Sequence, residues 1–81
     1  MSHFYQVNYF GMLAERRGIS QESVTSCATT AADLYSELDA AHRLGLAIGD
    51  LRAVVNDELI AWDHPLADGD RVAFLPPMSG G

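Results

Sequence analysis

The sequence predicts a small α+β domain in which one main helix lies across one face of a mixed sheet. Three patterns in its 81 residues lead to this prediction. Residues 3–10 alternate with period two, residues 30–45 repeat apolar positions with a helical period, and strand-like segments separated by turn residues follow residue 50. A chain of this length makes one domain, so we expect a packed domain over residues 1–75 and an extended tail over residues 76–81.

The first segment, HFYQVNYF, is typical of a strand with one buried face. Tyr5, Val7 and Tyr9 share one side of such a strand, because successive side chains point to opposite faces. Gln6 and Asn8 mark the other side as solvated. We therefore expect the first three side chains to lie in the core.

A short helix and a less regular strand are expected next. GMLAERRG fits two helical turns that end at Gly18, a residue type that accepts the left-handed conformation of a C-cap. Leu13 would point inward, and Arg16 and Arg17 would lie near the negative end of the helix dipole. The following QESVTSC contains good strand formers and predicts a second strand.

The main helix is predicted within TTAADLYSELDAAHRLGL. Thr30 and Asp33 resemble a capping box, in which the first side chain caps the helix and the fourth residue is acidic. One face of the helix is expected to contain the apolar residues Leu34, Leu38 and Ala41. Gly45 is the expected stop, and LAIGD is expected to form a loop.

Three strands are predicted in the rest of the chain, in the segments LRAVVN, ELIAW and RVAFL. A tight turn at NDEL joins the first two, and DHPLADGD contains turn residues throughout. Val72 and Phe74 are expected on one face of the last strand. Pro76 and Pro77 should end it, because proline has no N–H to donate to a sheet. The resulting order of elements is that of the β-grasp arrangement of ubiquitin-like domains, in which the first and last strands lie side by side at the centre.

The formal net charge of −6 limits the classes of molecule that we expect the chain to bind. An acidic chain is repelled by nucleic acid and by anionic membrane surfaces, so we expect neither as a partner. Basic protein surfaces are the natural partners of such a chain. The alternative is that the charge serves only to keep the protein soluble. The single cysteine, the absence of a signal-like start and the absence of a long apolar run predict a cytoplasmic protein.

The sequence does not present a catalytic or metal-binding motif. His3, His42 and His64 are scattered without a metal-ligand spacing, so no metal site is expected. Cys27 has no partner in a CxxC pattern and is expected to be a small core residue. The acidic residues that follow it are explained by turn formation: Asp57, Asp63, Asp68 and Asp70. The remaining group with reactive chemistry is the C-terminal carboxylate of Gly81.

The last residues, LPPMSGG, suit a tail that enters a narrow site. Pro76 and Pro77 favour an extended exit from the domain, and the six residues from Pro76 onward span roughly 20 Å when extended. Gly80 and Gly81 have no side chains and could enter a channel too narrow for a Cβ atom. Reaction with ATP would convert the carboxylate into an acyl-adenylate, which is a good acyl donor.

The stretch AVVNDELIAWDHPLADGDRVAFLPPMSGG resembles the C-terminal half of the small, sulfur-carrying subunit of molybdopterin synthase, and VNYFGMLAERRG resembles the start of that family more loosely. The resemblance implies a ubiquitin-like β-grasp fold. One departure is the pair Arg16 and Arg17, where the family often has apolar residues. That departure leaves the packing of the short helix open.

The resemblance also implies a chemical role for the tail. An E1-like enzyme uses ATP to adenylate Gly81, and a sulfur donor protein converts the transient acyl-AMP to a thiocarboxylate. The tail, Pro76, Pro77, Met78, Ser79 and Gly80, would then enter the large subunit, with Phe74 and Leu75 as further contacts. Sulfur is transferred there to cyclic pyranopterin monophosphate to build the molybdopterin dithiolene. Two small and two large subunits assemble, and the small subunit is not an enzyme by itself and binds no permanent cofactor.

Three other interpretations stay open at this point. The chain could be a sulfur carrier for another pathway, such as thiamin thiazole synthesis, or a ubiquitin-like modifier that forms amide bonds with lysines. It could also be a binding module whose last residues are a frayed end. All five basic residues are arginine. Genome composition is one explanation, and the other is that an activated Gly81 then meets no side-chain amine of its own chain.

Overall fold

The computed structural model describes residues 2–77 of the chain. Its elements follow the expected order, with one additional short 3₁₀ helix, η1, in the loop after the main helix. Their bounds are β1 His3–Tyr9, α1 Met12–Arg17, β2 Gln21–Ser26, α2 Ala31–His42, η1 Ile48–Asp50, β3 Arg52–Val55, β4 Glu58–Ile60 and β5 Arg71–Leu75.

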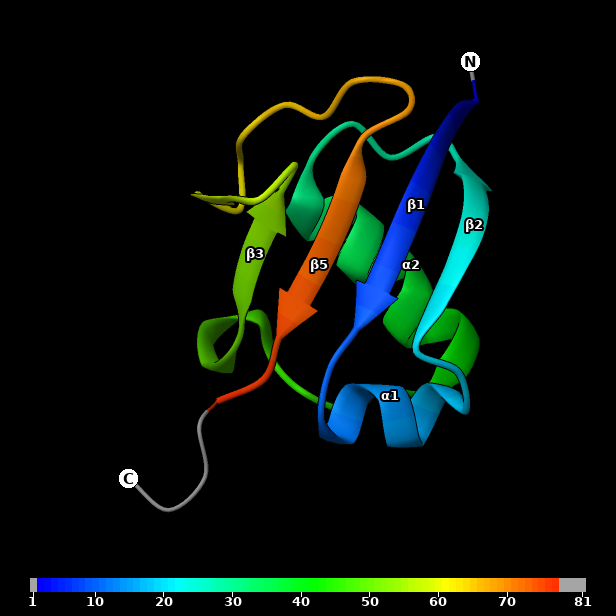
Figure 1. Ribbon diagram of the computed structural model, residues 1–81, viewed down its shortest axis with the longest axis vertical. Coiled ribbons are helices and arrows are strands. Elements are labelled where there is room, and N and C mark those ends of the chain that lie inside the picture. Colours follow the sequence, from blue (N-terminus) through cyan, green and yellow to red (C-terminus); the bar gives the residue numbers. More distant parts are fainter. Residues whose placement is uncertain (1, 78–81) are drawn as a thin grey trace.

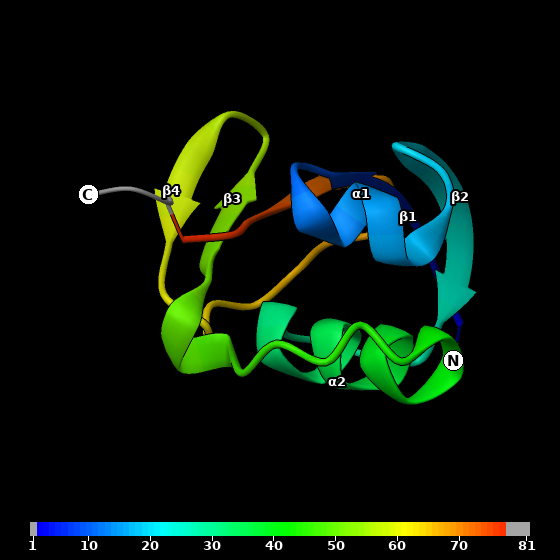
Figure 2. The same cartoon turned by 90° about the horizontal axis from the view of Figure 1, so that it is seen from below.

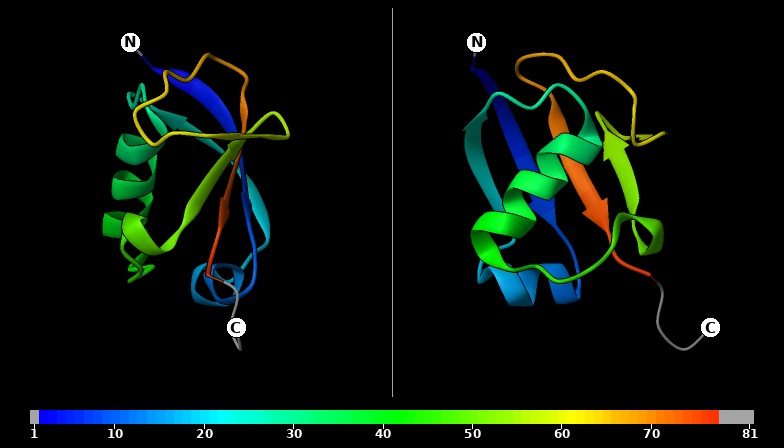
Figure 3. Two further views of the ribbon diagram at one scale, coloured as in Figure 1. Left: turned by 90° about the vertical axis from the view of Figure 1, so that its left-hand side faces the viewer. Right: turned by 180° about the vertical axis from the view of Figure 1, so that it is seen from behind.

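The five strands form one mixed sheet in the order β2-β1-β5-β3-β4. The central pair, β1 and β5, is parallel, and the other neighbours are antiparallel. Helix α2 covers one face of this sheet, as Figures 2 and 3 show, while α1 lies at the end where β1 and β5 finish (Figure 1). The predicted β-grasp arrangement, with the first and last strands side by side, is confirmed.

The core lies between the sheet and α2. On the central strands the side chains of Tyr5, Val7 and Tyr9 are buried, as predicted, and Val72 and Phe74 are fully buried beside them. The hydroxyl of Tyr5 donates to the carbonyl oxygen of Ala28 over 2.6 Å, so this ring fills the core without an unpaired polar group. The two parallel strands at the centre are therefore fixed by apolar burial.

Helix α1 is attached to the domain by one apolar residue and by its arginines. Leu13 is fully buried, and Gly18 closes the helix in the left-handed conformation with φ 88°, both as predicted. Arg16 donates to the carbonyl oxygen of Leu44 over 2.6 Å, and Arg17 pairs with Glu22 over 2.7 Å. Polar contacts thus hold this helix at the two positions where the departure from the family pattern had left its packing open.

The predicted start of α2 is confirmed, because Thr30 accepts a hydrogen bond from the backbone N–H of Asp33 over 3.2 Å. The predicted face was partly wrong. Leu34 and Leu38 are buried together with Ala31 and Tyr35, whereas Ala41 is exposed.

The predicted stop of α2 at Gly45 was also wrong. The helix ends at His42, and Arg43 takes the left-handed cap with φ 55°. Asp39 stabilises this earlier end, because its side chain accepts from the N–H of Gly45 over 2.7 Å. Leu44 then turns into the core and is fully buried, whereas an uninterrupted helix would have placed its side chain elsewhere.

Strands β3 and β4 are joined by a two-residue turn at Asn56 and Asp57, whose φ angles of 50° and 71° suit a primed hairpin turn. The predicted return strand ELIAW was too long, because β4 ends at Ile60. Trp62 leaves the sheet, and its carbonyl oxygen accepts from the N–H of Ala32 over 3.0 Å. Trp62 thus pairs with the start of α2 instead of with a neighbouring strand.

Two further predictions concern the loops at the end of the sheet opposite α1. The turn role of the acidic residues is confirmed for Asp57, Asp63 and Asp68, which lie in turns, and for Asp70, which accepts from the N–H of Ala67 over 2.8 Å. Asp68 also accepts from the N–H of Phe4 over 2.6 Å and so ties its turn to β1. The prediction that Cys27 is a core residue was wrong. Its neighbours Ser26 and Ala28 are buried, and the alternation of the chain places the thiol outside.

Candidate functional site at the tail root

Three residues, Leu75, Pro76 and Pro77, form what we call the tail root, where the chain leaves the sheet toward its last residues. The tail root continues from the central strand β5 and lies at the same end of the molecule as α1 (Figure 1). The side chains of Leu75 and Pro76 are half-buried, and Pro77 is exposed. The predicted tail residues Met78, Ser79, Gly80 and Gly81 lie outside the described residues and remain predictions.

Phe74, the residue before the tail root, is part of the core. Its ring lies parallel to the indole of Trp62, with centroids 6.0 Å apart and planes 8° apart, and it meets Tyr35 edge-on at 5.2 Å. Its side chain is fully buried and so presents no surface to another protein. We assign it the role of fixing β5 in place, and Leu75 is the first residue of this segment with an exposed side-chain surface.

Pro76 passes close over Gly11, the residue that precedes α1. A Cβ atom built on Gly11 would lie 3.1 Å from Cγ of Pro76, which is tighter than an ordinary van der Waals contact. Gly11 also has φ 56°, a conformation that favours glycine. The start of α1 therefore sets the direction in which the tail leaves.

A surface hollow of about 460 Å³ flanks the tail root on the side of η1. It is lined by Gly49, Asp50, Arg52, Leu75, Pro76 and Pro77. Arg52 stands opposite Leu75 in the antiparallel pairing of β3 and β5. A Cβ atom on Gly49 would meet nothing within 4 Å, so this side of the tail root is open.

An exposed apolar surface spreads from the tail root over the face of the sheet that α2 leaves uncovered. The strand pairing places Leu59 beside Val54, and Val54 beside Ala73. Leu75 follows on β5, and Phe10 continues the same side of β1. We call these five residues the outer apolar patch. Leu59 is 68% exposed and Phe10 47% exposed, which is unusual for large apolar side chains and typical of a protein-binding surface.

Sequence reasoning did not identify Phe10 or Leu59 as site residues. The signal available for Phe10 was the alternation of β1, which places it on the side opposite Tyr5, Val7 and Tyr9. For Leu59 no comparable signal existed, because the segment ELIAW is too short to show which side faces the core.

Comparison with known proteins agrees with this geometry. The ThiS family model matches residues 7–81. The chain belongs to this family. It is 39% identical over 79 residues to the molybdopterin synthase sulfur carrier subunit of Escherichia coli strain K12, and this match covers 94% of the chain and 98% of the relative. The resemblance deduced from the sequence is thereby confirmed.

Solved structures with the same fold support the assignment of this ThiS-family chain. Small archaeal modifier protein SAMP1 from Haloferax volcanii matches with a TM-score of 0.79 and 27% identity, over 96% of this chain and 99% of that one. A chain in the complex of subunits 1 and 2 of the Helicobacter pylori molybdopterin-converting factor matches with a TM-score of 0.65 and 30% identity, over 96% of this chain and 99% of that one. A ubiquitin from Caldiarchaeum subterraneum shares the fold, with a TM-score of 0.64 and 15% identity over the whole of both chains.

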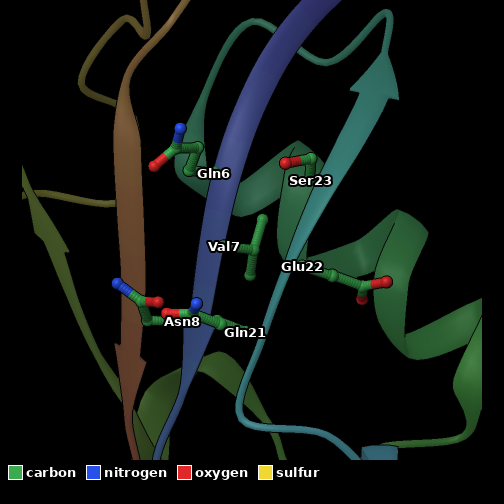
Figure 4. Close-up of a pocket in the computed structure, with 6 residues that line it drawn as sticks. All are labelled: Gln6, Val7, Asn8, Gln21, Glu22 and Ser23. Atoms are coloured by element: carbon green, nitrogen blue, oxygen red, sulfur yellow. The ribbon is translucent and has the colours of Figure 1, made fainter.

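A second hollow, of about 220 Å³, lies on the sheet face between β1 and β2 of this ThiS-family chain (Figure 4). It is lined by Gln6, Val7, Asn8, Gln21, Glu22 and Ser23. Figure 4 shows the carboxylate of Glu22 directed away from the amides of Gln6 and Asn8. The hollow therefore presents amides and a hydroxyl, without an acid or base placed for catalysis.

The carboxylate of Glu22 belongs instead to the attachment of α1. It accepts from two guanidinium nitrogens of Arg17, over 2.7 and 2.9 Å, and from the hydroxyl of Tyr9 over 2.6 Å. The hydrogen bonds from Arg17 are the main reason why the pKa of Glu22 lies below its ordinary value. Burial, reinforced by the nearby carboxylate, raises the pKa of Tyr9. This cluster of Tyr9, Arg17 and Glu22 is structural, and it attaches α1, the helix that sets the tail direction.

Within residues 2–77, no three His, Cys, Asp or Glu side chains are grouped so that they could hold a metal ion. The same part of the chain contains no helix long and apolar enough to cross a membrane. The described residues thus bring together a tail root, a hollow and an apolar patch, which are features of recognition.

The charges of this ThiS-family chain are unevenly distributed along the sheet. Arg16 and Arg17 lie on α1 and Arg52 begins β3, so these cations lie at the end that bears the tail root. The turn after β3 and the loop between β4 and β5 lie at the opposite end (Figure 1), and they contain Asp57, Glu58, Asp63, Asp68 and Asp70. The hollow beside the tail root itself contains one cation and one carboxylate, Arg52 and Asp50.

Proposed function

We propose that this chain is the sulfur carrier subunit of a molybdopterin synthase. The observation that supports the proposal most strongly is the 39% identity to a protein of that name over nearly the full length of both chains. The match includes the tail, since the family model extends to residue 81. In the proposed role the domain is not catalytic by itself, and it presents its C-terminal residue to other proteins in the cytoplasm.

The chemistry begins at the carboxylate of Gly81. An oxygen of this carboxylate attacks the α-phosphorus of ATP on an E1-like enzyme, which forms an acyl-adenylate and releases pyrophosphate. The outer sulfur of a persulfide on a donor protein then attacks the carbonyl carbon and displaces AMP, which gives an acyl disulfide with the donor. A second thiol attacks the donor's sulfur of that disulfide, so that a new disulfide forms on the donor and the thiocarboxylate is released on Gly81. Two such carriers deliver the two sulfurs of the dithiolene to cyclic pyranopterin monophosphate in the large subunit.

The geometry of the tail root supports this role. A central strand with its side chains locked in the core gives the tail a fixed origin, and Pro76 and Pro77 favour an extended exit. Six residues from Pro76 to Gly81 reach roughly 20 Å, enough to carry the terminal group away from the domain into a partner. The outer apolar patch offers that partner a surface to dock on while it holds the tail. In this proposal the partner is the large subunit, with two small and two large subunits per assembly.

Two other functions would use the same activation chemistry at Gly81. A sulfur carrier for another pathway, such as thiamin thiazole synthesis, is supported by membership of the ThiS family. A protein modifier is supported by the similarity to SAMP1, which is named as a small archaeal modifier protein. The three differ in the product: sulfur in molybdopterin, sulfur in another product, or the C-terminus joined by an amide bond to lysines of other proteins.

The deciding experiment incubates the chain with an E1-like enzyme, ATP and a sulfur donor and then determines the mass of the tail fragment. We expect sulfur in place of one oxygen on Gly81, and its loss when the large subunit and cyclic pyranopterin monophosphate are added. The mass change nearly equals oxidation of a methionine, so fragment ions must separate Gly81 from Met78, and alkylation must trap the thiocarboxylate.

The control is the same chain without Gly81, which should acquire no sulfur. An unmodified carboxylate on the full chain under these conditions would contradict every carrier function. Amide-linked adducts on other proteins, in place of sulfur transfer to the precursor, would favour the modifier.

A further inference from the structure

We propose that Arg52 places a positive charge beside the tail without placing an amine there, so that the activated C-terminus reacts only with other molecules. The inference rests on the proposed function, because it presupposes an activated carbonyl at Gly81. It goes beyond that function, since it assigns a role to a residue outside the tail and explains why that residue is arginine.

The position of Arg52 relative to the tail is the first observation. Arg52 opposes Leu75 in the β3–β5 pairing, and it lines the same hollow as Pro76 and Pro77. Paired residues on neighbouring strands have Cα atoms about 5 Å apart. Gly81 lies six positions after Leu75. The chain is therefore long enough for its end to reach the side chain at position 52, and the main cost is the entropy of closing a short loop.

The chemistry of the guanidinium group is the second observation. Arginine keeps its proton at all physiological pH values, so its nitrogens have no free electron pair with which to attack an acyl group. A lysine amine is nucleophilic in its neutral form, which is a growing fraction of the amine at alkaline pH. At position 52 the two residues would supply the same charge, but only lysine could be acylated by the tail.

The thiol of the chain lies at the opposite end. Cys27 follows Ser26, which pairs with His3, whereas Tyr9 pairs with Phe74 next to the tail root. Six residues of β1 separate His3 from Tyr9, which corresponds to about 20 Å along the sheet. The four residues after Pro77 reach about 14 Å. The exposed thiol of Cys27 is therefore out of reach of Gly81, although it is free to react with other molecules.

The sequence as a whole fits this arrangement, since all five basic residues are arginine. Arg71 provides the comparison within the same sheet. It begins β5, four residues before Leu75, and its side chain pairs with Asp57 over 3.2 Å. From Pro77 back to Arg71 is about 20 Å along the strand, so a lysine at position 71 would meet Gly81 only if the last four residues and its own side chain were both fully extended.

The test uses chains that have a C-terminal thioester on Gly81, made by fusion to an intein and cleavage with a small thiol. This chemical activation requires no activating enzyme. The variants are Arg52→Lys and its matched control Arg71→Lys, each incubated at mildly alkaline pH. In Arg52→Lys the amine nitrogen attacks the thioester carbonyl, an amide bond forms, and the small thiol leaves as its thiolate while the amine loses a proton to water.

We expect the thioester of Arg52→Lys to disappear at least about tenfold faster than that of Arg71→Lys or the unchanged chain. Its product is a monomer in which proteolytic mapping joins residue 52 to residue 81. Equal rates in the two variants, or hydrolysis as the only product in both, would overturn the assignment of Arg52. A faster reaction in Arg71→Lys would overturn it as well.

An enzymatic arm separates this inference from the proposed function. The same variants are incubated with the E1-like enzyme and ATP without a sulfur donor, and pyrophosphate release is measured with the internal amide. If the thioester arm gives the amide and no pyrophosphate is released by any variant, the proposed activation fails while the placement of Arg52 holds. If all variants release pyrophosphate and Arg52→Lys forms no amide in either arm, the inference fails while the activation holds.

Discussion

Pro76 passes over Gly11 so closely that a single added methyl group would lie 3.1 Å from its ring. The first residue after β5 is thus in contact with the residue that begins α1, although 65 positions separate them in the sequence. Helix α1 therefore does more than cover the end of the sheet. It links the direction of the tail to a helix that is itself held by Leu13, Arg16 and Arg17.

The first prediction concerns Gly11→Ala. Gly11 has φ 56° and ψ −132°, outside the left-handed helical region, so an alanine there costs about 1–3 kcal/mol in backbone strain, and its Cβ must also displace Pro76. We expect lower stability in urea and, in addition, slower sulfur transfer by the folded variant. The control is Gly18→Ala, where φ is 88° and a Cβ would meet nothing within 4 Å. Equal loss of sulfur transfer in both variants would mean that strain, and not the displaced tail root, is responsible.

The second prediction concerns the outer apolar patch. Leu59→Asp should weaken binding of the large subunit by about tenfold or more, because a charge replaces the most exposed apolar side chain of the patch, while the free energy of unfolding changes little at this exposed site. Titration calorimetry with the large subunit measures the first quantity and urea unfolding the second. Ile19→Asp is the control, since Ile19 is similarly apolar and 41% exposed but lies in the turn between α1 and β2. Equal losses of affinity would argue against the patch.

The sequence predicts the parts of this fold that depend on short-range patterns. The alternation of Tyr5, Val7 and Tyr9, the cap at Thr30 and the left-handed stop at Gly18 are local features, and the structure contains each of them. The side-by-side placement of the first and last strands came from analogy with ubiquitin-like domains, and the sulfur-carrying role of the tail came from the family resemblance. Neither follows from periodicity alone.

The errors occur where distant contacts override a local pattern. Ala41 has the correct helical spacing but is exposed, because the helix ends at His42 and Leu44 enters the core instead. Asp39 fixes that end through a hydrogen bond to a residue six positions later. Phe74 had been expected among the partner contacts, and the stacking with Trp62 that places it in the core joins segments that the sequence does not relate.

The third prediction concerns this aromatic cluster. Phe74→Ala should lower the free energy of unfolding by about 3–5 kcal/mol, a large part of the roughly 4–12 kcal/mol available to a domain of this size. Trp62 is the only tryptophan and stacks on the ring, so its fluorescence reports the unfolding transition in urea. The milder Phe74→Leu keeps the variant folded for binding measurements. Phe10→Leu, at an exposed phenylalanine, should change stability by less than about 0.5 kcal/mol, and a comparable loss there would contradict the distinction between core and surface.

The last prediction is a dependence of stability on pH that originates at Glu22. Its folded-state pKa is lowered, chiefly by the hydrogen bonds from Arg17, so the ionised carboxylate stabilises the folded state. This contribution is complete above the ordinary pKa of 4.5 and is lost as the pH falls below that value through the folded-state pKa. Glu22→Gln should therefore be less stable than the unchanged chain by about 1–2 kcal/mol at pH 7, and the difference should shrink below about pH 4.5.

Urea titrations between pH 3 and pH 7, followed by the fluorescence of Trp62, measure the difference directly. Tyr9→Phe is the matched variant, because it removes one donor to the carboxylate and leaves both bonds from Arg17 in place. It should lose stability and still retain most of the pH dependence, since Arg17 is the larger cause of the shift. If the difference in free energy of unfolding between Glu22→Gln and the unchanged chain stays constant over this range, the pairing with Arg17 does not favour the ionised form. In that case α1, and with it the origin of the tail, would be held by Leu13 and Arg16 without help from this ion pair.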